Sequence, residues 1–444
     1  MHARGALALA AFAVAVGGCD RKKAASPAPA AAAAPDAAPD AGPRASGARL
    51  VLGHVAQLTG DQAIFGQSTD RGARLAVNEQ NAKGGVKGRI VELRTVDDGG
   101  KADEAAVAAT RLATQGGAAA LLGESSSARS LAMAPVADTA AVPMVTPSST
   151  SPRVTREGDR VRAFVFRVCF TDAFQGAAMA SFVRDSLKLD RVAILRDASD
   201  EASTGLADAF AARLRALGGV IVADESYRAG DRDFKAQLES LKGKDAQALY
   251  VPGSYAEAAR VAIQAREVGL TQPLLGGDGW DSAKLYEVGG KALEGASFTN
   301  HYAPDVSDPR VRDFVKRYKE AWGDAPDAHA ALGYDAARVV MEAMVRASEP
   351  AGAALRDAIA QTKGFAGVTG AISIDPGHDA VKPAVVVEVR NGGARYVTTI
   401  RPEPAPLDAA APSQRPDGGA AAAKVPRSPE ARGARRSTGS PSPR

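Results

Sequence analysis

The chain is poor in the residues and motifs on which most catalytic and disulfide-stapled proteins depend. Its 444 residues include only two cysteines and five histidines, and aromatic residues make up 5%. So few cysteines exclude a disulfide framework, and the histidines show no metal-ligand spacing. The chain also has no Gly-x-Ser-x-Gly motif, no P-loop and no Gly-x-Gly-x-x-Gly motif. We therefore expect no catalysis, no metal and no cofactor.

A strong charge of either sign is also missing. The formal net charge is +4, and the segment after Arg401 supplies seven basic residues against four acidic ones. The rest of the chain is therefore close to neutral. A near-neutral region lacks the basic surface that nucleic acid attracts, so we expect no nucleic-acid partner.

The N-terminus contains an apolar run that is too short to cross a bilayer. Arg4 precedes the apolar residues 6–16, and two glycines and Cys19 follow them. A short positive start, a short apolar stretch and small residues before a cut site are typical of a secretory signal. We expect residues 1–18 to be a signal peptide, and the protein to leave the cytoplasm.

Cys19 stands where a lipoprotein signal peptidase would leave the acylated first residue, although Val16 occupies a position that usually holds Leu. Acylation would hold the protein on a membrane through buried methylene groups, without a spanning helix. The alternative is an ordinary signal with an incidental cysteine. Asp20 is similar to the signal that retains some Gram-negative lipoproteins in the inner membrane. We expect lipidation at Cys19 and a periplasmic or cell-surface location.

Both ends of the chain have compositions that cannot bury a core. Residues 19–48 are almost entirely Ala, Pro, Asp and Lys, and residues 402–444 are rich in Pro, Ala, Gly and Ser. We expect a flexible tether after the lipidated cysteine and a disordered tail at the other end. The roughly 350 residues between them suggest two domains with a large core. Such a core needs no disulfide, so we expect Cys169 to be a small buried hydrophobe rather than a reactive thiol.

Short β-branched runs alternate with longer helical patterns between these two ends. This alternation implies parallel sheets with right-handed crossovers, and therefore an α/β fold. The first series predicts strands at 50–55, 90–96, 118–122 and 142–145, with helices at 69–81, 103–114 and 127–138. The second series predicts strands at 191–195, 220–224, 248–251 and 273–275, with helices at 174–187, 206–217, 234–241 and 256–268.

Three further helical stretches and three strand-like pieces follow the second series. The helices must cover a sheet, and the first lobe, with fewer helices of its own, is their plausible location. We expect lobe 1 to comprise 49–168 plus 300–366, and lobe 2 to comprise 169–299 plus 367–401. A hinge of several segments would then join two Rossmann-like lobes and permit their closure. These helices are expected at 309–321, 328–347 and 352–361, and the strands at 368–374, 384–389 and 395–400.

A series of motifs runs in order along this region, at 57–60 (Gln-Leu-Thr-Gly), 66–67, 73–88, 97–98, 146–152, 170–176, 264–270 and 276–280. Together they resemble the leucine/isoleucine/valine-binding protein family, the type I periplasmic binding proteins that serve branched-chain amino-acid importers. The resemblance implies the type I periplasmic-binding-protein fold. It also implies a monomer that binds an amino acid, branched-chain or related, between two closing lobes.

The same resemblance implies partners in the membrane. These would be the permease and ATPase subunits of an ABC importer, which receive the ligand from the binding protein. An alternative stays open on the same fold. The protein could be a ligand-sensing component, or could bind amides or aromatic or small carboxylic acids.

Serines before a predicted helix are the first candidate site. Ser125, Ser126 and Ser127 follow a predicted strand, so their hydroxyls and the free N–H groups of the helix end can form an anion site. The alternative is that one of them is simply the N-cap. The resemblance assigns a ligand carboxylate to Ser127.

The loop Ser148-Ser149-Thr150 is the second candidate, and Pro147 and Pro152 fix it in a non-helical geometry. The resemblance implies that these three residues offer N–H donors to a carboxylate, and a carbonyl and the Thr150 hydroxyl to an ammonium. Without the resemblance, a stretch of this composition is only a loop.

Asp278 is the third candidate, because it lies between two glycines at the end of a strand in lobe 2, where parallel sheets bind ligands. The resemblance implies that it pairs with the ligand ammonium, although a bare Gly-Asp-Gly is often a turn. The other positions at which the family contacts its ligand depart from the common aromatic pattern. They hold Phe65, Ala202 and Ser254, with Tyr255 as a partial replacement and Trp280 as an expected apolar wall that could equally be packing.

Overall fold

The computed structural model describes residues 49–402. The expected signal peptide, the lipidation at Cys19 and the tether lie outside the described residues, as does the expected tail apart from Pro402. Within residues 49–402, no helix has both the length and the hydrophobicity that crossing a bilayer requires.

The first sheet has five parallel strands in the order β2-β1-β3-β4-β7. Every residue of β1 and β3 is buried, because helices cover both faces, as is general for parallel sheets. Successive side chains of β1 therefore enter different cores, Leu50 and Leu52 one core and Val51 and Val55 the other. The strands are β1 Leu50–Ala56, β2 Val91–Asp97, β3 Ala118–Leu122, β4 Met144–Thr146 and β7 Val165–Arg167.

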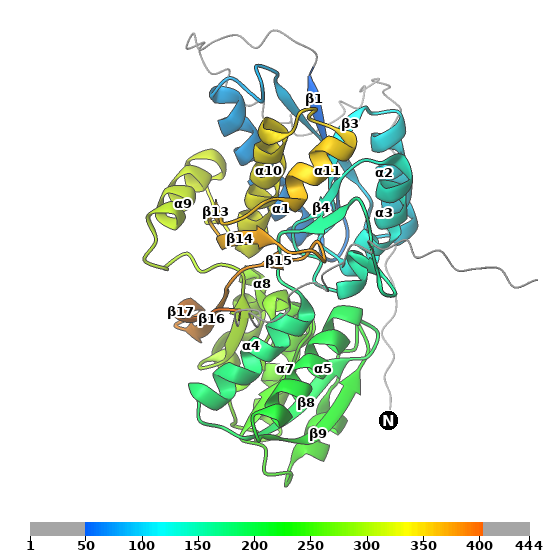
Figure 1. Ribbon diagram of the computed structural model, residues 1–444. Coiled ribbons are helices and arrows are strands. Elements are labelled where there is room, and N and C mark those ends of the chain that lie inside the picture. The colour runs from blue at the N-terminus through cyan, green and yellow to red at the C-terminus, as the bar shows by residue number, and fades with distance from the viewer. Residues whose placement is uncertain (1–48, 403–444) are drawn as a thin grey trace, which may run out of the picture. The chain divides into compact units, whose positions relative to one another are not determined.

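Six helices belong to this sheet in the described part of the chain, and together they form lobe 1 (Figure 1). The helices α1, α9, α10 and α11 share one core, and α2 and α3 share the other. A Cβ added to Gly72 of α1 would lie 1.9 Å from the Ala330 carbonyl oxygen of α10, so only glycine permits this approach. The helices are α1 Ala63–Ala82, α2 Ala102–Thr114, α3 Ser127–Ala140, α9 Pro309–Trp322, α10 Ala328–Arg346 and α11 Gly352–Ala360.

The second sheet has seven strands in the order β17-β16-β12-β11-β10-β8-β9. Its strands from β8 to β12 are parallel, and β16 and β17 add an antiparallel edge. The strands are β8 Arg191–Asp197, β9 Val220–Tyr227, β10 Ala248–Tyr250, β11 Leu274–Gly276, β12 Ser297–Asn300, β16 Ala384–Arg390 and β17 Gly393–Ile400.

Helices also cover both faces of this second sheet, and together they form lobe 2. One face carries α4 and α5, and the other carries α6, α7 and α8. The two lobes, each with a largely parallel sheet between helices, confirm the predicted α/β fold. The helices are α4 Asp172–Asp185, α5 Glu201–Ala216, α6 Lys235–Leu241, α7 Tyr255–Glu267 and α8 Ala283–Gly289.

A small third sheet differs from the sequence expectation. The predicted strand at 368–374 is instead part of a hairpin that begins at Phe365. The side chains of Phe365, Ile372 and Ile374 in this hairpin enter the core of lobe 1. The predicted boundary after residue 366 stays a prediction, and this packing favours a boundary near Pro383 instead. The strands are β13 Phe365–Gly367, β14 Gly370–Ile374 and β15 Ala380–Val381.

The chain passes between the two lobes after β7, after β12 and after β15 (Figure 1). Each lobe is therefore built from separated stretches of sequence. Several parallel connections let two lobes rotate without unfolding either of them. The remaining short elements are η1 Pro152–Val154, β5 Arg156–Glu157, β6 Arg160–Val161, η2 Asp278–Trp280 and η3 Gly290–Leu293.

Candidate functional site

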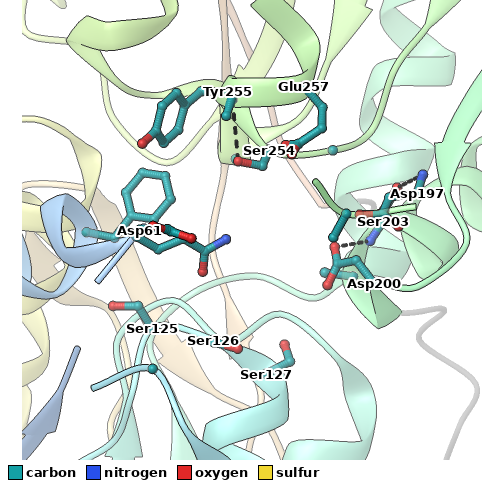
Figure 2. A pocket seen from close by; sticks show the side chains of 18 of the residues that line it. Asp61, Ser125, Ser126, Ser127, Asp197, Asp200, Ser203, Ser254, Tyr255 and Glu257 are labelled. Carbon is teal, nitrogen blue, oxygen red and sulfur yellow. Dashed lines mark hydrogen bonds between the residues drawn. The ribbon is translucent and has the colours of Figure 1, made fainter. Parts of the chain in front are cut away.

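A cavity of about 660 Å³ lies between the lobes (Figure 2). Its walls follow the carboxyl ends of β1, β2, β3 and β4 in lobe 1, and of β8, β9, β10 and β11 in lobe 2. Ligands of parallel α/β sheets bind at this edge. The structure brings eight of the ten predicted contact residues to this cavity: Phe65, Ser127, Ser148, Thr150, Ala202, Ser254, Tyr255 and Asp278.

The serines of lobe 1 lie at the N-terminus of α3. Ser126 is the N-cap residue, but its side chain makes no capping hydrogen bond, so the N-cap alternative does not account for its hydroxyl. The Ser127 hydroxyl accepts a hydrogen bond from the Ser151 N–H at 3.2 Å. The first N–H groups of a helix carry partial positive charge and point out of its end. This wall of the cavity is therefore suited to an anion.

The loop after β4 places two of its three predicted residues in the cavity wall. Ser148 and Thr150 line the cavity, and the Thr150 carbonyl accepts the Asp172 N–H at 3.1 Å. Ser149 does not line it, which corrects its predicted contact role. Its hydroxyl donates to the Glu124 carbonyl at 2.8 Å, and its own carbonyl accepts from Arg167 at 2.6 Å. Ser149 therefore holds the loop from inside lobe 1.

Asp278 projects from lobe 2, and two side chains hold its carboxylate. Gln175 Nε2 donates to Oδ1 at 3.0 Å, and His301 Nε2 lies 3.0 Å from Oδ2. Burial by itself would raise the pKa of Asp278, but these hydrogen bonds outweigh it and hold the pKa below its usual value. Burial also lowers the pKa of His301 to about 4. At pH 7 a neutral His301 therefore donates its Nε2–H to an ionised Asp278.

Asp172, in the first turn of α4, is a residue near the site that sequence reasoning missed. It is 2% exposed, and neither carboxylate oxygen has a hydrogen-bond partner among the described residues. Burial raises the pKa of Asp172 to about 7, and the charge of Asp278 adds to the shift. An acid in a first helical turn usually only stabilises that turn, so Asp172 was given no role of its own within the motif at 170–176.

The positions that depart from the aromatic pattern leave an open pocket. Phe65 stacks on His329 with ring centroids 4.3 Å apart, and meets Tyr255 of lobe 2 edge-on at 5.6 Å. Ala202 and Ser254 add little side-chain volume to the same cavity. Trp280 does not line it, which corrects the expected apolar wall. Its ring is fully buried, and its indole N–H donates to the Val251 carbonyl at 3.1 Å.

Carboxylates outnumber cations in the cavity wall. Arg129 is the one arginine of the described residues that lines it, and it lies 2.9 Å from Glu124 and 3.8 Å from Asp98, two buried acids. Burial raises the pKa of Asp98 to about 6, and the charge of Glu124 contributes. Between residues 49 and 402, no cluster of His, Cys, Asp and Glu has the arrangement of a metal site. The acids that line the cavity are Asp61, Asp197, Asp200, Glu257 and Asp278.

Cys169 lies behind the site, in the core of lobe 1. It is fully buried, and its thiol contacts the Ser149 carbonyl at 3.3 Å. Burial raises the pKa of Cys169 to about 12. A protonated, inaccessible thiol is inert, in agreement with the expectation of a small buried hydrophobe.

Comparison with known proteins gives matches over most of the folded region. The sequence model of the family described as periplasmic binding protein matches residues 50–394. A Brucella melitensis protein called Leu/Ile/Val-binding protein homolog 3 is 32% identical over 301 residues, which are 68% of this chain and 80% of that protein. A Pseudomonas aeruginosa protein called amino acid binding protein is 31% identical over 311 residues, 69% of this chain and 82% of that one.

Solved structures give the same result. The leucine-binding protein LivK from Thermotoga maritima matches with a TM-score of 0.73 and 40% identity, over 80% of this chain and 99% of that one. The branched-chain amino acid transporter substrate-binding protein LivJ from Streptococcus pneumoniae, solved with isoleucine, matches with a TM-score of 0.74 and 32% identity. That match covers 80% of this chain and all of the other.

These matches confirm the type I periplasmic-binding-protein fold. The family consists of solute-binding proteins of ABC transporters and not of enzymes, and its members work outside the cytoplasm. The motifs between Arg49 and Arg401 therefore identified the family correctly. The chain belongs to the periplasmic binding protein family.

Proposed function

We propose that this protein binds an α-amino acid in the cavity between its lobes and delivers it to the permease and ATPase subunits of an ABC importer. The observation that carries the proposal is the polarity of the cavity. Hydroxyls and the N-terminus of α3 line it on lobe 1, and the ionised Asp278 lines it on lobe 2. The names of the relatives from Brucella melitensis and Pseudomonas aeruginosa agree with such a ligand.

The ligand carboxylate would lie against lobe 1. The hydroxyls of Ser127 and Ser148 and the N–H groups at the start of α3 are its donors in this proposal. Hydrogen bonds to an ionised acceptor are shorter and about twice as strong as neutral ones. A carboxylate at a helix N-terminus also benefits from the helix dipole.

The ligand ammonium would lie against Asp278, with the Thr150 hydroxyl as a second acceptor. Asp278 belongs to lobe 2, whereas Ser127 and Thr150 belong to lobe 1. One small ligand would therefore contact both lobes and stabilise their closed arrangement. A ligand shifts such an equilibrium only through its differential affinity for the two states, and contacts to both lobes supply that difference.

The N-terminus suggests how the protein is retained near its importer. A lipid on Cys19 would anchor it to a membrane, with Asp20 favouring the inner membrane of a Gram-negative cell. The protein would work as a monomer on a flexible tether. Mass spectrometry of the protein extracted from cells tests the anchor. We expect diacylglycerol on an N-terminal Cys19, and a mature N-terminus at any other residue would contradict it.

A thermal-shift screen of the purified protein tests the proposed ligand class. A ligand at a thousand times its dissociation constant stabilises a protein by about 4 kcal/mol. We expect α-amino acids to raise the melting temperature, and uncharged amides or purely anionic acids of the same shape to leave it unchanged. If amides or acids stabilise the protein and α-amino acids do not, the role given to Asp278 is wrong.

A further inference from the structure

One end of the cavity carries buried carboxylates that the proposed head-group contacts do not use. Asp197, at the end of β8, is 6% exposed, and Glu257, in the first turn of α7, is 8% exposed. Both line the cavity, and Asp200 lines it beside them. Figure 2 shows these three acids along one side of the open volume, away from Asp61.

The partners of these two buried acids are all neutral. Asp197 Oδ1 accepts from the N–H of Ser199 at 2.8 Å and from its hydroxyl at 2.6 Å. Glu257 Oε1 accepts from the Gly230 N–H at 3.2 Å. Within residues 49–402, no lysine, arginine or histidine forms an ion pair with either acid. These hydrogen bonds go to Asp197 Oδ1 and Glu257 Oε1.

A tyrosine hydroxyl without a partner lies close to these acids. Tyr227 of β9 pairs with Asp197 of β8 in the sheet. This tyrosine is 3% exposed, and its hydroxyl has no hydrogen-bond partner among the described residues. That hydroxyl lies beneath Gly253, where an added Cβ would be only 2.2 Å away. Gly253 lines the cavity and Tyr227 does not, so the hydroxyl lies behind the cavity wall. Buried polar groups normally have hydrogen-bond partners.

Small residues line the cavity beside these groups. Ala202, Gly230 and Gly253 line the cavity here, and none of them has a side chain larger than a methyl group. Among residues 49–402, Arg129 is the only arginine that lines the cavity, and it is already paired with Glu124 at 2.9 Å. When the lobes close over a ligand, water leaves the cavity, and buried charges without a counter-ion become costly. With a neutral ligand side chain, Asp197 and Glu257 would stay buried without a counter-ion.

We propose that the bound amino acid carries a positively charged side chain, an ammonium or a guanidinium, held between Asp197 and Glu257. This substrate class rests on the proposed function, because the α-carboxylate and α-ammonium still occupy the head-group contacts. The side-chain cation donates to Asp197 Oδ2 and Glu257 Oε2. The chain therefore differs in ligand from relatives whose names specify branched-chain amino acids.

Matched ligands on the purified full chain test this proposal by isothermal titration calorimetry. L-arginine and L-citrulline have nearly the same shape, and only arginine is charged; L-lysine and L-norleucine form a second pair. A hydrogen-bonded charge pair corresponds to a factor of about ten or more in affinity. We expect each cationic ligand to bind at least about tenfold more tightly than its neutral counterpart.

The outcomes separate this proposal from the one on which it rests. If citrulline, norleucine or leucine binds as tightly as the cationic ligands, the cationic side-chain site is wrong and the amino-acid function stands. If no α-amino acid binds, both proposals are overturned.

Two variants locate the cation. We expect Glu257→Gln and Asp197→Asn to weaken arginine about tenfold and to change citrulline less than about twofold. The matched control is Glu287→Gln, an exposed acid of α8 outside the cavity, which should change neither ligand. An equal loss for arginine and citrulline would assign these acids a purely structural role and contradict the proposal. Melting temperatures identify a variant that fails to fold, and the ligand pairs on the unaltered chain then still decide the question.

Discussion

The two walls of the cavity contrast in chemistry. The lobe 1 wall consists mainly of hydroxyls and backbone N–H groups, with the exposed Asp61 at its edge and Arg129, which Glu124 already neutralises. The lobe 2 wall carries the carboxylates of Asp197, Asp200, Glu257 and Asp278. One wall can accept an anion through many weak donors, whereas the other can accept cations through a few strong charges. From this contrast we infer that lobe 1 recognises the carboxylate that all α-amino acids share. Lobe 2 then determines which side chain is bound.

The largest expected effect comes from removing the head-group charge of lobe 2. Asp278→Ala leaves the ligand ammonium without its counter-ion, and truncating one partner of a buried charge pair costs about 2–5 kcal/mol. We expect at least a hundredfold loss of affinity by calorimetry. The matched control is Asp313→Ala, an exposed acid of α9, which should bind normally. Unchanged ligand affinity in Asp278→Ala would contradict the claim that the lobe 2 wall binds the ligand ammonium through Asp278.

The next effect concerns stability and pH. The pKa of Asp172 is about 7 in the folded protein against 3.8 in the unfolded chain, so between those values only the folded state keeps the proton. The free energy of unfolding therefore falls as pH rises from 4 to 7, by about 2–4 kcal/mol from this group. Asp172→Asn removes that dependence. We expect the variant to melt above the unaltered chain at pH 8 but not at pH 4.

The control for this comparison is Asp185→Asn, an exposed acid at the other end of α4. It should melt with the unaltered chain at both pH values. A difference between Asp172→Asn and the unaltered chain that stays constant from pH 4 to pH 8 would show that Asp172 ionises normally.

A smaller effect is expected from His301, which positions Asp278 without touching the ligand. His301→Phe removes the hydrogen bond at 3.0 Å, and we expect about a tenfold loss of affinity for α-amino acids. His301→Gln can still donate an N–H and should recover part of that loss. If the Phe and Gln variants bind equally, the ring acts by packing on Phe170, at 3.6 Å between centroids, and not through Asp278.

The smallest expected loss of affinity concerns the lobe 1 wall of the cavity. Ser127→Ala removes one hydroxyl among several donors of lobe 1, and a single neutral hydrogen bond contributes about 0.5–1.5 kcal/mol. We expect about a threefold to tenfold loss of affinity, well below that of Asp278→Ala. A loss as large as that of Asp278→Ala would mean that lobe 1 recognition depends on a single group.

Local patterns in the sequence predicted the features that depend on neighbouring residues, such as strands, helices and the residues at strand ends. The alternation of strands and helices predicted both lobes, and strand ends followed by Ser127, Thr150 and Asp278 predicted which residues meet at the cavity. Ser149 and Trp280 were placed wrongly because one residue of register separates a lining side chain from a buried one. Gln175 and His301 were missed because they reach Asp278 from 103 and 23 residues away, and no local pattern reports such contacts.

The acids of lobe 2 were missed for a related reason. Asp197 and Glu257 each lie at the start or end of a regular element, where an acid is most often a cap or a solvated charge. Only the packed structure shows that both are buried without a cation. The space left by Ala202 was visible in the sequence, but its chemistry depended on these neighbours.

The most direct test of the account compares one amino acid with two truncated forms of it. Calorimetry of the purified protein would measure L-arginine, its decarboxylated amine agmatine, and the α-keto acid that lacks the ammonium. We expect arginine to bind, and both truncated ligands to lose at least about a hundredfold in affinity, because each leaves one wall unpaired. Binding of agmatine or of the keto acid as tight as that of arginine would contradict recognition by both lobes.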